Sequence, residues 1–176
     1  MRRHLILVVR AMKAIFVAAI AAIAIQPLFF YVWFLLPAVI AGESVSGHDI
    51  LQMALYVLVF SAAFVLVIGI PAFLLLRRFN RATMPMLSLS GFLIALVPIM
   101  LLSWPGINSK GYSSGGNWHG KPVDYVIDGV TTIYGWLSYA ESSLMFGLHG
   151  LIGAIVFYFV WRRVVGPNYA IKVTAE

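Results

Sequence analysis

Residues 14–42 read AIFVAAIAAIAIQPLFFYVWFLLPAVIAG, a stretch without a charged side chain. A helix needs roughly 20 apolar residues to cross the hydrocarbon core of a bilayer, and this stretch exceeds that length. In lipid the backbone must satisfy its own hydrogen bonds, so a spanning segment is a helix or a barrel strand. This run lacks the apolar–polar alternation of a barrel strand, which indicates a helix. The run also continues too far past Ala22-Ile23-Ala24 for a cleaved signal peptide. We therefore expect an uncleaved first span at about residues 14–37.

The composition of the whole chain agrees with a membrane protein. Of its 176 residues, 62% are apolar and 10% are charged. Soluble domains are about 45–50% apolar and ~25% charged, so a soluble enzyme, a nucleic-acid binder and a disordered tail are excluded. The absence of cysteine excludes disulfides, thiolate metal sites and palmitoylation.

Three further apolar runs have the length of a membrane span. They lie at about residues 50–76, 84–104 and 138–161. The predicted fold is an all-α membrane protein with four transmembrane helices in a single integral membrane domain over residues 1–176. One sizeable loop, residues 105–134, joins the last two spans.

The basic residues predict the orientation of these spans. Ten of the twelve Lys and Arg residues fall on one side of the predicted bilayer: Arg2, Arg3, Arg10, Lys13, Arg77, Arg78, Arg81, Arg162, Arg163 and Lys172. The other side has Lys110 and Lys121, together with Glu43, Asp49, Asp124 and Asp128. Because cytoplasmic loops carry the excess of Lys and Arg, we expect both termini in the cytoplasm and the loop on the opposite side of the membrane.

Tryptophan positions fit the same arrangement. Trp33, Trp104 and Trp136 fall at predicted outer ends of spans, and Trp161 falls at an inner end. Tryptophan favours the headgroup level, since its ring is apolar and its N–H needs a partner. Pro37 and Pro105 stand where spans one and three should end. Pro27, Pro71 and Pro98 lie within spans and should kink them.

The loop contains a hairpin signal. Asp128-Gly129 separates Val123–Ile127 from Val130–Tyr134, and both flanking runs favour strands. Asp-Gly suits a type I′ turn, in which both central residues have positive φ. We expect a small β-hairpin on the outer membrane surface, preceded by an irregular, glycine-rich segment.

Two sets of residues in the predicted spans are candidates for specific contacts. Small residues in the fourth span share one helix face, which allows close helix packing within the chain or between two copies; they are Ser143, Gly147, Gly150 and Ala154. His149, Glu141 and Gln26 form a candidate intramembrane polar site. His149 is either a structural hydrogen-bonding residue or part of a proton relay, since buried ionisable groups in membranes often have a function.

Catalytic and metal-binding signals are weak. Gly111–Gly115 matches the pattern G-x-S-x-G, with His119 and Asp124 downstream, but the α/β sheet of a nucleophile elbow is not predicted. His119, Asp124 and Asp128, with His48 and Asp49, lack a recognised metal-ligand spacing. We therefore expect no enzyme activity, no metal and no cofactor.

Two resemblances bear on function. The segments SSGGNWHGKPV (113–123) and TIYGWL (132–137) are similar to a segment of small uncharacterised inner-membrane proteins of Gram-negative bacteria, which implies a location only. In outline, the length, the four spans and the internal termini are similar to immunity proteins against pore-forming colicins, and no residue is matched to them.

The leading hypothesis is a non-enzymatic binding protein, either an immunity-type protector or an accessory subunit of a membrane complex. Its partner would be another membrane or periplasmic protein, or a second copy, and not nucleic acid. The candidate contact residues are Trp118, His119, Asp124, Tyr125, Asp128 and Tyr134. The alternative is a small oligomeric transporter or channel that uses His149. A membrane enzyme acting on lipid or quinone is the third hypothesis.

Overall fold

The computed structural model describes residues 2–40, 42, 44–106 and 109–166. Within these residues four helices are long and apolar enough to cross a membrane, which confirms the predicted number. They are Val9–Ile40, Gly47–Arg78, Met84–Leu102 and Ile133–Val165. Glu43 and Lys172, which were used to predict the orientation, lie outside the described residues.

The first two spans each contain a π-helical turn ahead of a proline. The first consists of α1 (Arg2–Phe30), η1 (Tyr31–Leu35) and α2 (Leu36–Ile40), and the second of α3 (Gly47–Phe64), η2 (Val65–Gly69) and α4 (Ile70–Arg78). Pro37 and Pro71 follow these turns after one residue. A proline lacks an N–H and its ring clashes with the carbonyl one turn back, and a wider turn relieves both problems. The prediction that the first span ends at Pro37 is wrong, because the helix continues to Ile40.

The last span is the longest continuous α-helix. α6 (Ile133–Val165) has 33 residues, about 50 Å at 1.5 Å per residue. It begins at a cap formed by Thr132, whose side chain accepts from the Gly135 N–H, and ends before Gly166. The predicted start at residue 138 is therefore too late. Because the hydrocarbon core is about 30 Å thick, α6 extends beyond it.

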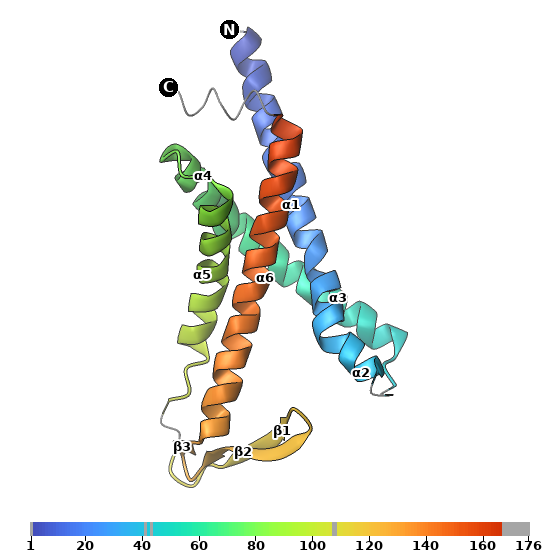
Figure 1. The fold of residues 1–176 in the computed structure, drawn as a ribbon, viewed down its shortest axis with the longest axis vertical. Coiled ribbons are helices and arrows are strands. Elements are labelled where there is room, and N and C mark those ends of the chain that lie inside the picture. Colours follow the sequence, from blue (N-terminus) through green and yellow to red (C-terminus); the bar gives the residue numbers. More distant parts are fainter. Residues whose placement is uncertain (1, 41, 43, 107–108, 167–176) are drawn as a thin grey trace.

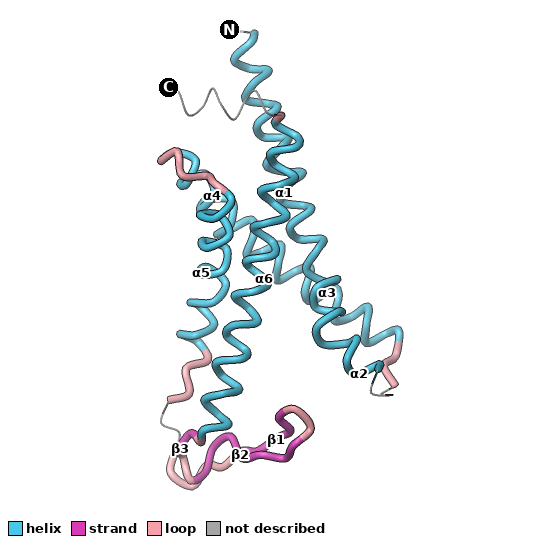
Figure 2. Tube along the Cα trace, viewed as in Figure 1, coloured by secondary structure: helices cyan, strands magenta, loops and turns pink. Residues whose placement is uncertain are grey.

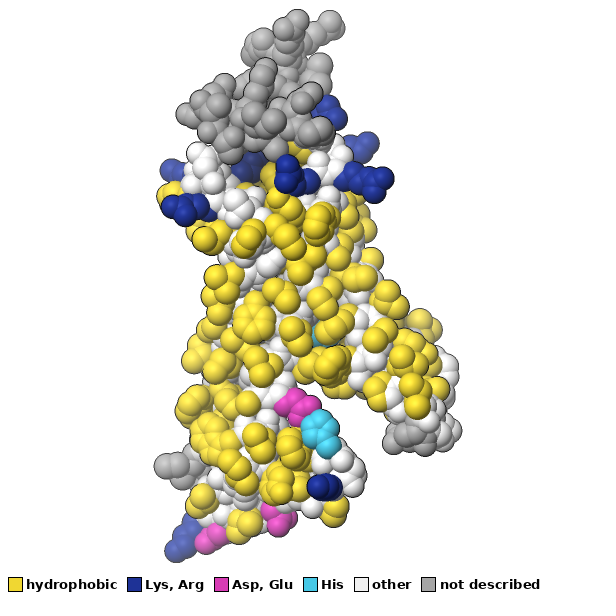
Figure 3. All heavy atoms as spheres, in the orientation of Figure 1, with side chains coloured by type: hydrophobic (Ala, Val, Ile, Leu, Met, Phe, Trp, Pro, Cys, Tyr) yellow, Lys and Arg dark blue, Asp and Glu magenta, His cyan; other side chains and the backbone are white. Residues whose placement is uncertain are grey.

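The helices form two arms that meet at one end. α5 (Met84–Leu102) lies beside α6, and α1 packs on the second half of α6, between the levels of Val165 and His149 (Figures 1 and 2). Toward the other end, α1 and α2 separate from α6. In the space-filling view a hollow opens between α6 on one side and the α2–α3 arm on the other (Figure 3). We call this space between α6 and the α2–α3 arm the lateral hollow.

Small residues allow α1 to approach α6. Ala14, Ala18 and Ala22 recur every four residues and are almost completely buried. They belong to a core cluster together with Ala19, Phe73 and Leu87. Its α6 members, Phe157, Trp161 and Val165, have the same spacing of four residues. Trp161, which the sequence places at the inner end of the fourth span, belongs to this cluster. Its ring packs edge-on against Phe73 at 5.0 Å and is 8% exposed.

A three-stranded antiparallel sheet of order β1-β2-β3 lies at the N-terminal end of α6. Its strands are β1 (Ser114–Trp118), β2 (Lys121–Ile127) and β3 (Val130–Thr131). The Asp128-Gly129 turn is confirmed, with φ values of 49° and 79°. The predicted strand to Tyr134 is wrong beyond Thr131, because Thr132 caps α6.

The glycine-rich segment predicted to be irregular contains β1. A second turn with two positive φ values, His119-Gly120, connects β1 to β2. The Tyr125 ring lies directly over Gly116, and a Cβ on Gly116 would come within 2.7 Å of the ring. Only glycine therefore fits at this position. Glycine thus accommodates a cross-strand aromatic ring rather than preventing strand formation.

The charged residues follow the long axis of the molecule. Figure 3 shows Lys and Arg gathered at the end where α1 begins, with an apolar surface along the middle. Arg77 and Arg78 end α4, and Arg162 and Arg163 lie in the last turn of α6. Asp124, Asp128, Lys110 and Lys121 belong to the sheet end. We refer below to the basic end and the sheet end.

Candidate functional site

Gln26 of α1 and His149 of α6 form a polar contact between two apolar helices. The Gln26 side chain is 5% exposed, and its Nε2 donates to the carbonyl oxygens of Ala22 at 3.2 Å and His149 at 3.1 Å. Its Oε1 lies 2.7 Å from Nδ1 of His149. Gly153 provides the space, because a Cβ there would lie 2.7 Å from Gln26 Nε2.

This arrangement fixes the tautomer of His149. Both N–H groups of the Gln26 amide face carbonyl oxygens, so Oε1 can only accept. The proton therefore lies on Nδ1 of His149, and in the neutral ring Nε2 carries the lone pair. The Phe29 ring packs edge-on against the imidazole at 4.6 Å. The arrangement thus leaves the second imidazole nitrogen as an acceptor.

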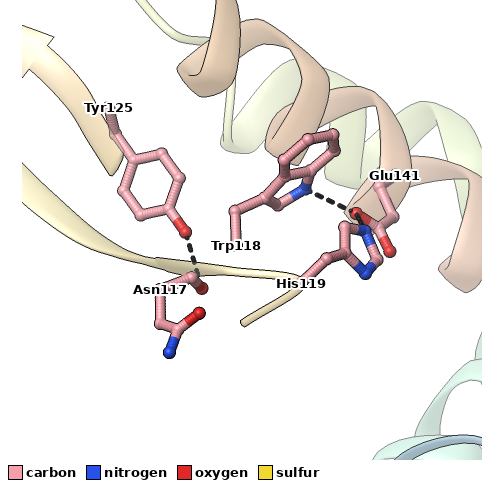
Figure 4. A network of polar contacts seen from close by, with 5 residues as sticks. All are labelled: Asn117, Trp118, His119, Tyr125 and Glu141. Carbon is pink, nitrogen blue, oxygen red and sulfur yellow. Dashed lines mark hydrogen bonds and ion pairs between the residues drawn. The ribbon is translucent and has the colours of Figure 1, made fainter. Parts of the chain in front are cut away.

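A second polar contact joins the sheet to α6. Nε1 of Trp118 donates to Oε2 of Glu141 at 2.9 Å, and Nε2 of His119 lies 3.1 Å from the same oxygen (Figure 4). An ionised carboxylate only accepts, so His119 donates through its Nε2–H. The positive φ of His119 belongs to the β1–β2 turn that brings both side chains to α6. Glu141 thus holds the turn against the helix.

The three residues of the predicted intramembrane polar site fall into two places. Glu141 precedes His149 by eight residues, about 12 Å along α6. Glu141 bonds to the sheet, whereas His149 and Gln26 bond to each other. The structure therefore brings Gln26 and His149 together and places Glu141 in a separate contact.

The base of the sheet is fixed on the first turn of α6. Thr132 Oγ1 donates to the carbonyl oxygens of Asp124 at 2.5 Å and Tyr125 at 3.2 Å, and its N–H also donates to Tyr125. Gly135 lies against the carbonyl of Tyr125 so closely that any Cβ would clash. The same residue, Thr132, thus ends the sheet and begins the helix.

Most of the predicted partner-binding residues stabilise the sheet itself. The Tyr125 hydroxyl donates to the Asn117 carbonyl at 3.1 Å (Figure 4), and Asp128 Oδ1 accepts from the Gly111 N–H at 2.6 Å. The Tyr134 ring packs on Trp118 at 5.5 Å. Of the candidate contact residues, Asp124 has an exposed side chain that neither anchors the turn nor packs on a ring.

The sequence reasoning missed an outward apolar pair. Ile127 and Val130 face each other across the Asp128-Gly129 turn and are 53% and 69% exposed. The adjacent pair, Val126 and Thr131, points to the opposite face, where Val126 is buried. The alternation of strand side chains, counted from the predicted turn, was a signal that could have found this pair.

The small-residue face of α6 packs on α5 of the same chain. The Gly150 backbone touches the Gly91 carbonyl so closely that a Cβ on Gly150 would clash. Ala154 lies beside Gly91, and Gly147 lies beneath the Phe92 ring. Ser143 is 2% exposed, and its Oγ has no hydrogen-bond partner within the described part of the chain. Of the two arrangements left open by the sequence, the structure has the contact within the chain.

Three of the residues that matched catalytic or metal patterns, Ser113, His119 and Asp128, have structural contacts. Oγ of Ser113, in the G-x-S-x-G match, accepts from the Asp128 N–H at 3.0 Å. His119 bonds to Glu141, as described above. Among residues 2–40, 42, 44–106 and 109–166, no three His, Asp or Glu side chains gather as metal ligands would. Ser113 therefore helps to hold the Asp128-Gly129 turn.

Comparisons of the chain with known protein families, with curated proteins and with solved structures give no match.

Proposed function

We propose that this chain is a bacterial inner-membrane protein that binds another protein through the outer face of its sheet. In this proposal the basic end is cytoplasmic and contains both termini, and the sheet end is extracytoplasmic. The charge distribution along the four apolar helices supports this orientation, because Lys and Arg are retained on the cytoplasmic side. The partner is a membrane or periplasmic protein for which the chain is a protector or an accessory subunit.

The exposed Ile127–Val130 pair supports the proposal most directly. These two apolar side chains lie together on a sheet whose base is bonded to α6 through Thr132. A rigid, preformed surface loses little conformational entropy when it binds. Exposed apolar side chains on a fixed sheet are available for contact with a partner.

Site-specific photocrosslinking tests this surface in native membranes. A photoreactive phenylalanine analogue at Ile127 should give one defined protein adduct. The same analogue at Lys121, an exposed position on the other end of β2, is the matched control and should give little of it. Mass spectrometry of the adduct then identifies the partner.

A double variant, Ile127→Thr with Val130→Thr, keeps residues that favour strands while removing the apolar surface. The partner should be lost from the purified complex while the sheet stays folded. A partner retained at the wild-type ratio, or equal adducts at Ile127 and Lys121, contradicts the proposed surface. The adduct's identity separates a protector from an accessory subunit.

The alternative function, an oligomeric transporter or channel, rests on His149. Its imidazole lies at the contact between α1 and α6, where Nδ1 bonds to Gln26 and Nε2 is left as an acceptor. In this alternative, His149→Leu abolishes transport while the protein still inserts. A normal transport rate in that variant would exclude the proton-relay role.

A further inference from the structure

The first span has no buried residue on the sheet-end side of Gln26. Residues 27–40 are all described, and none of them is buried, whereas Ala14, Ala18 and Ala22 are. The contact between α1 and α6 therefore ends around His149, which bonds to Gln26 and packs against the Phe29 ring. Beyond this point the lateral hollow separates the two helices (Figure 3). Water does not fill an apolar space at this depth of a bilayer, so the hollow needs an apolar occupant.

One carboxylate, that of Glu141, lies toward the sheet end of the hollow. Glu141 lies on α6 between the hollow and the sheet, and its side chain is 41% exposed. Both of its protein donors, Trp118 and His119, reach the same oxygen, Oε2. A carboxylate offers about four acceptor positions on two oxygens. Glu141 therefore keeps acceptor positions, on Oε1 above all, for a cationic donor.

The depth of Glu141 matches the headgroup boundary. Glu141 lies eight residues, or about 12 Å, from the first residue of α6. α6 exceeds the hydrocarbon core by about 20 Å in total, which places each boundary about 10 Å from a helix end. A lipid of the outer leaflet would thus have its headgroup beside Glu141 and its acyl chains beside residues 27–40.

We propose that the lateral hollow binds one phospholipid whose headgroup carries a primary ammonium group. The ammonium supplies three N–H donors and the charge opposite to that of Glu141. A trimethylammonium headgroup has the charge but no N–H donor, and an anionic headgroup would be repelled by the carboxylate. The acyl chains fill the apolar part of the hollow as far as the Gln26–His149 contact. The site does not depend on a protein partner at Ile127 and Val130.

Lipid retention by the full-length protein tests this proposal. The protein is reconstituted in nanodiscs with equal amounts of phosphatidylethanolamine, phosphatidylcholine and phosphatidylglycerol, then purified in mild detergent for native mass spectrometry. We expect one phosphatidylethanolamine per chain, enriched about tenfold over phosphatidylcholine, as one charge-assisted hydrogen bond would give. Glu141→Gln should remove this preference. Asp124→Asn, which removes an exposed carboxylate from the same sheet, should retain it.

Several outcomes would overturn the proposal. They are equal retention of the two zwitterionic lipids by the wild type, a preference for phosphatidylglycerol, and an unchanged preference in Glu141→Gln. A lipid-free dimer or heteromeric complex would show that a protein segment occupies the hollow instead. The wild-type comparison of the two zwitterionic lipids needs no variant, so a folding defect in Glu141→Gln would leave the test intact.

Discussion

Gln26 and His149 hold the first and last membrane helices together at the level where these helices separate. The Gln26 amide bonds both to the backbone carbonyl and to Nδ1 of His149. On the basic side of this contact, alanines bring α1 close to α6, and on the sheet side the lateral hollow begins. The contact therefore marks the position along α6 at which α1 leaves it.

Gln26→Leu should destabilise the protein by about 1–2 kcal/mol, because Nδ1–H of His149 loses its acceptor in an apolar environment. Thermal unfolding in detergent should show the melting temperature lowered by a few degrees. Gln52→Leu is the matched control, since Gln52 is exposed on α3 and bonds within its own helix. Equal effects of the two substitutions would argue against a role for the helix contact.

Gly150→Ala should separate α5 from α6 and cost about 1–3 kcal/mol, because the new Cβ would overlap the Gly91 carbonyl and Ala95. Gly47→Ala makes the same chemical change at the start of α3, where a Cβ meets nothing within 4 Å. It should be neutral or slightly stabilising. Chemical or thermal unfolding of both variants measures the difference, and a neutral Gly150→Ala would show that the close contact is unimportant.

Trp118→Phe should loosen the β1–β2 turn while keeping an aromatic ring beside Tyr134. The variant loses the N–H that bonds to Glu141. Hydrogen exchange of the amides in residues 114–122 should accelerate by up to about tenfold, corresponding to a loss of ~1.4 kcal/mol. Trp104→Phe is the control, since Trp104 lies outside the sheet and its ring is 59% exposed. Unchanged exchange in Trp118→Phe would show that the indole bond does not order the turn.

Single-cysteine labelling should establish the proposed orientation. The chain has no native cysteine, so Lys121→Cys and Arg78→Cys each give a unique thiol. A membrane-impermeant maleimide should label position 121 in intact spheroplasts, and position 78 only after the membrane is permeabilised. The reverse pattern would invert the orientation and place the sheet in the cytoplasm.

Local sequence was sufficient for the spans and for one turn. An uncharged run such as residues 14–42 has to be a helix in lipid, whatever its neighbours are. The Asp128-Gly129 turn was likewise predictable, because its two positive φ values depend on those two residues alone. The strand β1 was not predictable in this way, since its glycines fit only when the Tyr125 ring packs across Gly116.

The sequence by itself determined the class of protein, the number of apolar helices and the concentration of basic residues outside the spans. The tertiary structure alone decided which residues meet: Gln26 with His149, Glu141 with Trp118 and His119, and Gly150 with Gly91. The physical reason is that lipid-facing and protein-facing positions of a membrane helix are about equally apolar. Hydrophobicity therefore encodes that a helix crosses the bilayer, but it does not encode which face of that helix contacts its neighbour.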